Sequence, residues 1–192
     1  LTTVQTANLS TDHIKNLTTT QVAALSSDQI KALSTDQLAL FDTDQMAAIG
    51  TILTQALTTD QFVALSTTQL QYWSQAQIAA LSLDQLSVMT TDQLVSLTTD
   101  QVPAFSDDQI AALTIEQISL LTTDQLRSLD TSQIAAMEDE DVAALTTDQV
   151  GNLRALQVSA LTTEQVASMT TDQLGVLTTS QMRGMGTDQI VA

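Results

Sequence analysis

The sequence predicts an all-α solenoid, a superhelix of 24 short helices with one helix in each eight-residue repeat. Three observations predict this fold. The chain divides without remainder into 24 octads with the consensus LTTDQVAA, because 24 × 8 is 192. The first and sixth positions of the octad are apolar. The second and fifth positions carry the residue types that begin a helix.

Five positions of the octad are regular enough to test against local structures. Position one is apolar in every octad, with Leu in 16 of them. Position six is Ile, Val, Leu, Met or Phe in 22 octads, the exceptions being Thr6 and Thr54. Position two is Ser, Thr or Asp in 20 octads, and position four is acidic in 16. Position five is Gln in 21 octads and departs from Gln only at His13, Leu53 and Asp141.

Neither an extended strand nor one continuous helix fits this pattern. Side chains alternate with period two along a strand, so positions one and six would point to opposite faces. In a continuous helix, eight residues overshoot two turns by about 80°, so no straight apolar stripe survives. One short helix per octad fits, because position six and the next position one lie three residues apart on the same face.

The polar positions predict how each helix begins. Ser or Thr at position two is suited to the N-cap, and Gln at position five then lies at N3, which completes the capping box S/T-x-x-E/Q. Positions one and six become N′ and N4, the pair that forms a hydrophobic staple. The acid at position four lies at N2, near the positive end of the helix dipole.

These helices must stack on one another. A helix of about six residues is too short to be stable alone in water. We expect a superhelix with positions one and six inside and with positions two to five on the polar outer surface or in the seams between coils. The handedness and the number of octads per turn do not follow from the sequence.

Four of the octads that depart from the consensus carry specific expectations. The seventh, residues 49–56, lacks both the acid and the Gln, so a local irregularity is predicted there. The thirteenth carries Pro103, which removes one amide donor at little expected loss to so short a helix. The eighteenth carries four consecutive acids, residues 138–141. In the twentieth, Arg154 replaces the cap and Leu156 the acid, which predicts a weaker helix start with an apolar group at a polar position.

The unbroken period predicts one domain over residues 1–192, a single octapeptide-repeat array without a linker. Hydrophobic residues make up 43% of the chain, which is enough for a core. The sequence starts in frame at Leu1 and stops in frame at Ala192, whereas complete arrays finish with atypical polar units. We therefore expect an internal slice of a longer array.

The charge of the chain excludes several partners. The formal net charge is −17, and 16 of the 22 acids occupy position four, where we expect them to line a regular ridge. Such a surface repels nucleic acid and anionic lipid, so no nucleic-acid partner is expected. The chain has no Cys and no run of 18 apolar residues, so neither disulfides nor membrane insertion are expected.

No catalytic, cofactor-binding or metal-binding residue is predicted, and we expect no enzyme. Catalysis needs a nucleophile, a base and an orienting group placed together, whereas the chain has one His and no Cys. His13 occupies a Gln position and is interpreted as a surface residue. The run from Glu138 to Asp141 is the best candidate for weak cation binding, and we interpret it as a solvated patch. Trp73 occupies position one and is expected in the core.

The octads LTTDQVGN, LSTDQLAL and LTTDQLRS resemble the repeat tracts of very large bacterial secreted proteins described as adhesins, haemagglutinins or haem utilisation/adhesion proteins. The resemblance covers the whole chain and implies a bacterial, cell-surface or extracellular stalk. A more distant resemblance links LTxxQVxA to TAL-effector repeats, which bind DNA. The period and the charge of this chain both differ from that family, so DNA binding is rejected.

Two functions follow as hypotheses. The first is a structural repeat region, a stalk, spacer or filament of a bacterial surface adhesin, in which uncapped ends would favour lateral or end-to-end self-association. The second is a binding module whose Thr/Asp/Gln surface contacts glycan, ice or Ca²⁺. Position seven varies widely, which favours the spacer, whereas position three is Thr in 17 octads, which keeps the second hypothesis open.

Overall fold

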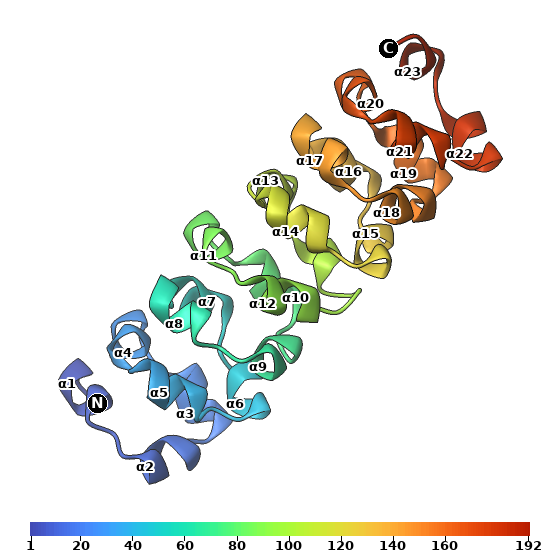
Figure 1. Ribbon diagram of the computed structural model, residues 1–192. Coiled ribbons are helices and arrows are strands. Elements are labelled where there is room, and N and C mark those ends of the chain that lie inside the picture. Colours follow the sequence, from blue (N-terminus) through green and yellow to red (C-terminus); the bar gives the residue numbers. More distant parts are fainter. The chain divides into compact units, whose positions relative to one another are not determined.

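The computed structural model describes residues 1–192 and contains one short helix in every octad (Figure 1). Twenty-three of these helices are α-helices of five or six residues, one is a 3-10 helix, and there is no strand. The predicted all-α repeat fold is therefore confirmed. None of the helices is long and apolar enough to cross a membrane.

The chain packs as two compact units, Leu1–Leu97 and Thr98–Ala192. The helices of the first unit are α1 (Thr3–Ala7), α2 (Thr11–Lys15), α3 (Thr19–Ala23), α4 (Ser27–Ala32), α5 (Thr35–Ala39), α6 (Thr43–Ala47), α7 (Thr51–Ala56), α8 (Thr59–Val63), α9 (Thr67–Gln71), α10 (Gln75–Ala79), α11 (Leu83–Ser87) and α12 (Thr91–Ser96). The helices of the second unit are the 3-10 helix η1 (Val102–Ala104), α13 (Asp107–Ala111), α14 (Ile115–Leu120), α15 (Thr123–Ser128), α16 (Thr131–Ala136), α17 (Asp139–Ala144), α18 (Thr147–Asn152), α19 (Ala155–Ala160), α20 (Thr163–Ser168), α21 (Thr171–Gly175), α22 (Thr179–Gly184) and α23 (Thr187–Val191). That the octads form a single array stays a prediction.

Each α-helix starts directly after position two, as the capping box requires. In α8, the Thr58 hydroxyl accepts the Gln61 N–H at 3.2 Å, and Gln61 Oε1 accepts the Thr58 N–H at 2.9 Å. Where position two is Gly50, Glu138, Arg154 or Gly186, no side chain caps the helix. The weaker start predicted at Arg154 agrees with this missing cap.

Each six-residue helix ends at the next position one, where the backbone becomes extended. Leu33 has φ −68° and ψ 141°, and its N–H still bonds the Ile30 carbonyl at 3.2 Å. The following Ser34 is again extended and caps the next helix. Ser and Thr compete with helix formation by bonding nearby backbone groups, so position two both ends one helix and starts the next.

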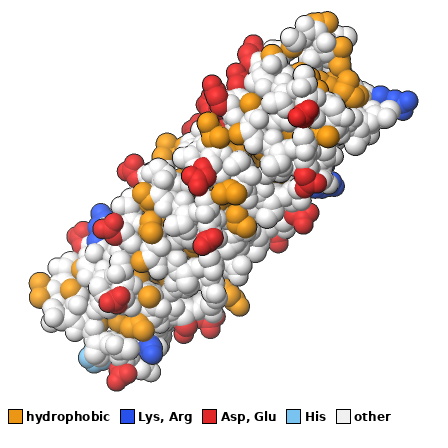
Figure 2. Space-filling model, viewed as in Figure 1, with side chains coloured by type: hydrophobic (Ala, Val, Ile, Leu, Met, Phe, Trp, Pro, Cys, Tyr) orange, Lys and Arg blue, Asp and Glu red, His pale blue; other side chains and the backbone are white.

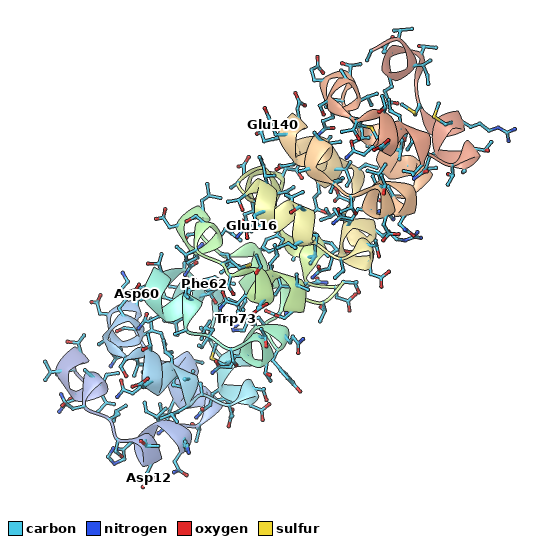
Figure 3. All side chains as sticks on the ribbon, viewed as in Figure 1. Asp12, Asp60, Phe62, Trp73, Glu116 and Glu140 are labelled. Atoms are coloured by element: carbon cyan, nitrogen blue, oxygen red, sulfur yellow. The ribbon has the colours of Figure 1, made fainter.

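Positions one and six form the interior of both units, as predicted. Phe62 and Ile78 at position six are fully buried, and Leu65 and Trp73 at position one are each 3% exposed. The rings of Phe62 and Trp73 lie 6.1 Å apart and are tilted by 45° (Figure 3). Burying an apolar side chain of this size contributes about 1.5–3 kcal/mol, so stacking supplies the stability that a single short helix lacks.

Helices three octads apart pack side by side within each unit. In the first unit α4 packs against both α1 and α7, and in the second α17 packs against both α14 and α20. Most hydrogen bonds between coils join residues 28 to 31 positions apart, as from Gln69 to Phe41 and Leu38. Since 28 residues are three and a half octads, one superhelical turn takes between three and four octads.

Two of the irregular octads show how far the backbone tolerates substitution. Residues 49–56 still form the helix α7, so the predicted irregularity is restricted to the missing cap and the side chains. The expectation that Pro103 leaves its helix almost unchanged was wrong, because this octad forms only the 3-10 helix η1. Pro103 has no N–H to donate to the carbonyl four residues earlier, which is the bond that an α-helix needs. Pro also disfavours the α conformation in the residue before it.

The 28-to-31-residue register predicts that the fold tolerates whole octads but not single residues. One Ala inserted between Ala64 and Leu65 displaces Gln69, Gln77 and Gln85 from carbonyls that lie before the insertion. Each lost set of buried hydrogen bonds costs about 1–3 kcal/mol, so the urea midpoint of unfolding should fall clearly. The matched control inserts the whole octad LTTDQVAA at the same place and should unfold like the parent chain. Equal midpoints for the two insertions would contradict the register.

Candidate functional site: the glutamine seam

The most regular polar feature of the molecule is a row of position-five side chains between successive coils. We call these side chains and the backbone carbonyls that they contact the glutamine seam. All 21 Gln residues at position five accept the N-cap N–H through Oε1, at 2.7 to 3.1 Å. This half of the contact is local and follows the predicted capping box.

The other half of the contact crosses to the preceding coil. In both units, Nε2 of position-five Gln donates to the position-one carbonyl 28 residues upstream at 2.6 to 3.0 Å. The Gln residues that do so are 29, 37, 45, 61, 69, 77, 85, 93, 133, 149, 157, 165, 173, 181 and 189. All of these except Gln29 also donate to a second carbonyl, 30 or 31 residues upstream.

One side chain therefore performs two tasks. Gln61 accepts the N–H that starts its own helix and donates to Ile30 at 2.9 Å and to Leu33 at 2.7 Å. A primary amide has two donor hydrogens and an acceptor oxygen, and here both ends are used. Leaving such a buried group unpaired would cost about 1–3 kcal/mol.

The structure decides between the two places that the sequence pattern left open for position five. The Gln side chains lie in the seams between coils and are mostly buried, with Gln85 at 1% exposed and Gln157 fully buried. The capping box was predicted, but the contacts across coils were not. One signal was present: a capping box accepts Glu as readily as Gln, yet no octad carries Glu at position five.

The three position-five exceptions behave differently from one another. His13 is exposed, as expected, and its Nδ1 takes the place of the Gln oxygen by accepting the Ser10 N–H at 3.2 Å. Leu53 and Asp141 are buried at 5% and 2% exposure and donate no hydrogen bond to the preceding coil. The seam thus has two breaks, one in each unit.

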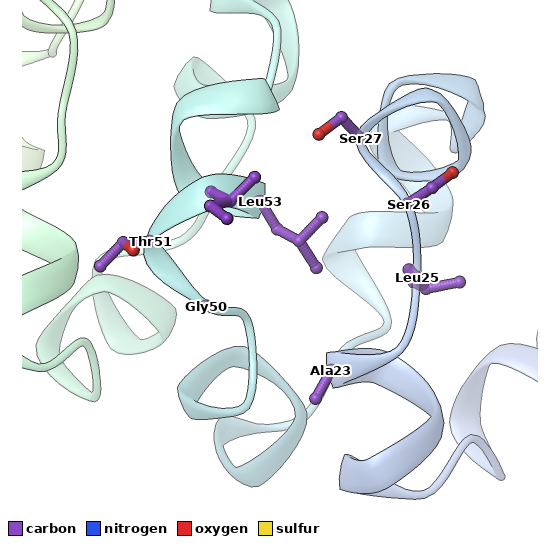
Figure 4. Close-up of a pocket in the computed structure, with 8 residues that line it drawn as sticks. Ala23, Leu25, Ser26, Ser27, Gly50, Thr51 and Leu53 are labelled. Carbon is purple, nitrogen blue, oxygen red and sulfur yellow. The ribbon is translucent and has the colours of Figure 1, made fainter.

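A hollow lies beside the break at Leu53 (Figure 4). It is lined by the link between α3 and α4, around Leu25 and Ser26, and by the start of α7, at Gly50 and Leu53. Leu25 lies 28 residues before Leu53, so its carbonyl is the one that a Gln at this position would contact. The neighbouring Ile52 is 72% exposed.

All sixteen position-four acids are exposed, in agreement with the expected polar ridge. On the visible face, acidic side chains are scattered over the surface and basic side chains are few (Figure 2). Asp60 projects outward, away from the aromatic pair of the same unit (Figure 3). No three Asp, Glu or His side chains converge as ligands for a metal ion.

Two acids near the seam have pKa shifts of opposite sign. Asp130, an N-cap, accepts the Gln133 N–H at 2.9 Å and the Ser132 hydroxyl at 2.8 Å, and these bonds lower its pKa. It therefore stabilises the fold at neutral pH and loses that effect as the pH falls through its lowered pKa. Burial raises the pKa of Asp141, and the charges of Glu138 and Glu140 raise it further.

The repeat itself identifies the family. A family model described as the ALTTAQ repeat matches residues 1–35, 19–51, 54–91, 87–123, 118–155 and 134–171, which together cover most of the chain. The chain belongs to the ALTTAQ repeat family. The six letters of that name coincide with residues 56–61, ALTTDQ, except for the acid at position four. They include the capping Thr and the seam Gln. No curated protein matches this ALTTAQ chain.

Removing one seam amide should destabilise the ALTTAQ array. Gln61→Met keeps the length of the side chain but removes the bonds that Gln61 makes with the Thr58 N–H and with the Ile30 and Leu33 carbonyls. We expect a loss of about 1–3 kcal/mol in the free energy of unfolding, measured by urea titration. Gln55→Met is the matched control, because Gln55 is exposed. If both variants unfold at the same urea concentration, the seam contributes nothing to stability.

Proposed function

We propose that this ALTTAQ array is a structural repeat region that serves as a stalk, spacer or filament of a bacterial surface adhesin. The observation that carries the proposal is the uniformity of the glutamine seam. In both units, seam Gln residues donate to the carbonyl 28 residues upstream, and the same separation recurs along the array, as at Gln69, Gln77, Gln165 and Gln173. A protein whose repeats are interchangeable can vary in length without redesign of its core.

Stability in such an array is close to a sum over neighbours. Beyond its own octad, the position-five Gln bonds octads three to four places earlier, and the helices pack against partners three places away. Added octads therefore extend the molecule and bury their own apolar positions. Additive stability suits a spacer, because the useful property of a spacer is its length.

The surface supports an extracellular location in the proposal. Exposed acids recur every eight residues, which keeps an extended chain soluble and limits association with anionic surfaces. The alternative binding module would have to use Thr and Asp alone, because most seam Gln side chains are buried. Lateral or end-to-end association between copies belongs to the same proposal, since an array end presents seam groups without a neighbouring coil.

A length series tests the spacer. Chains of 24 and 48 octads should give particles whose long dimension grows in proportion to octad number, with and without Ca²⁺. Electron microscopy with small-angle scattering measures that dimension. A 48-octad chain no longer than the 24-octad chain would contradict the spacer. Particles that become ordered only with Ca²⁺ would favour the binding module.

Surface labelling tests the location independently. An antibody raised against the 192-residue chain should label intact cells of the source bacterium or bind material shed from them. Labelling that requires permeabilised cells would contradict the surface assignment and leave the spacer itself untouched.

A further inference from the structure

Asp141 is the only ionisable side chain among the buried residues. It occupies position five of the octad 137–144 and is 2% exposed. The equivalent side chains one octad away on either side, Gln133 and Gln149, donate to the carbonyls of Phe105 and Leu121, both at 2.7 Å. Asp141 therefore replaces a donor with a carboxyl group inside the seam.

The register of the seam identifies the backbone carbonyl that a Gln at position 141 would contact. The carbonyl 28 residues upstream of Asp141 belongs to Leu113, which is 5% exposed and receives no hydrogen bond from a side chain. Asp141 keeps the local half of the Gln role, because Oδ2 accepts the Glu138 N–H at 3.1 Å. An ionised carboxylate has no hydrogen to donate, so it cannot form the bond that a Gln forms to the carbonyl of the earlier coil.

The rest of α17 is held by later octads. Gln173 donates to the carbonyls of Val142 and Leu145, and the Ser168 hydroxyl donates to the Asp139 carbonyl at 2.9 Å. The missing bond therefore affects only the contact between α17 and the earlier coil. Packing of α17 against α14 remains on that side.

Every charged side chain on the surrounding helices is acidic. No Lys, Arg or His lies on α13, α14, α17 or α20 to offset the charge of Asp141. The acids on or capping these helices are Asp107 and Asp108 (α13), Glu116 (α14), Glu138, Asp139 and Glu140 (α17) and Glu164 (α20). Burial raises the pKa of Asp141, the hydrogen bond from the Glu138 N–H partly opposes this rise, and repulsion from Glu138 and Glu140 adds to it. Folding therefore favours the protonated form of this carboxyl group.

We propose that protonation of Asp141 tightens the seam of the second unit. When the carboxyl group is protonated, its O–H donates to the Leu113 carbonyl and joins α17 to the earlier coil. When it is ionised, this hydrogen bond is absent. The proton thus supplies the donor that Gln supplies elsewhere. The device is local to one coil and leaves the neighbouring Gln contacts unchanged.

The direction of the pH effect on stability distinguishes Asp141 from an acid whose pKa is lowered by folding. The folded-state pKa of Asp141 lies above the unfolded value. The contribution of Asp141 to the free energy of unfolding is therefore fully present below the unfolded pKa and is lost as the pH rises through the folded pKa. Asp130 acts in the opposite direction, so the whole chain reports the sum of both. A comparison of variants isolates Asp141.

Asp141→Asn in the 192-residue chain provides that comparison. Asn keeps the size of Asp, and its amide can accept from Glu138 and donate toward Leu113 at any pH. We expect the variant to exceed the parent chain in stability at pH 7. As the pH falls, the ratio of their unfolding constants should shrink by up to tenfold per pH unit between the folded and unfolded pKa values of Asp141. Urea titrations from pH 7.5 to 4 measure this ratio.

Two further measurements make the result decisive. Leu53→Gln fills the other break with a neutral donor, so its effect on stability should not vary with pH beyond that of the parent. Carboxyl ¹³C NMR of the parent chain needs no variant to fold and should show the pKa of Asp141 above the ordinary value of an aspartate. A pH-independent difference between parent and Asp141→Asn, or titration of Asp141 at or below the ordinary aspartate value, would overturn the proposal.

Discussion

The rest of the structure depends on the side-chain amide of Gln at position five. Helices of five or six residues do not persist alone, and apolar stacking has no direction that would fix one coil over the next. The amide supplies that direction. Its oxygen accepts at the start of its own helix, and its nitrogen donates to carbonyls 28 and about 31 residues earlier, as Gln77 does to Ile49 and Met46. Local folding and the superhelical register are thereby fixed by the same side chain.

The charged and the neutral polar side chains of the octad occupy different environments. The acid at position four is exposed and one residue away from a buried amide, so the array carries a large negative charge without placing it in the seam. Asp141 is the exception that shows why this separation matters. A carboxylate satisfies the capping half of the position-five role but cannot satisfy the carbonyls across the coil, and burial then opposes its ionisation.

Much of the fold followed from the sequence. The octad period, the apolar spacing of positions one and six, and the capping residues predicted one short helix per octad, and residues as different as Phe62 and Thr54 at position six are buried as that pattern requires. These features are local, so spacing alone reveals them. The resemblance to repeat tracts agrees with membership of the ALTTAQ repeat family, while the adhesin context stays a prediction.

The contacts between coils could not be predicted in the same way. Spacing within an octad says nothing about which earlier carbonyl a side chain reaches, because that depends on how many octads complete a turn. The preference for Gln over Glu indicated a need for a donor but not its partner. Pro103 was misjudged for a related reason: in so short a helix, one missing N–H changes the helix type instead of merely weakening it.

Hydrogen exchange of the Gln side-chain amides tests the central claim most directly. In ¹⁵N-labelled protein, the Nε2 hydrogens of buried position-five residues such as Gln77 and Gln165 should exchange slowly and in step with the helix amides around them. The exposed Gln55 should exchange at the rate of a free side chain. Fast exchange at Gln77 and Gln165, equal to that of Gln55, would contradict the account, because it would show that these amides do not hold successive coils together.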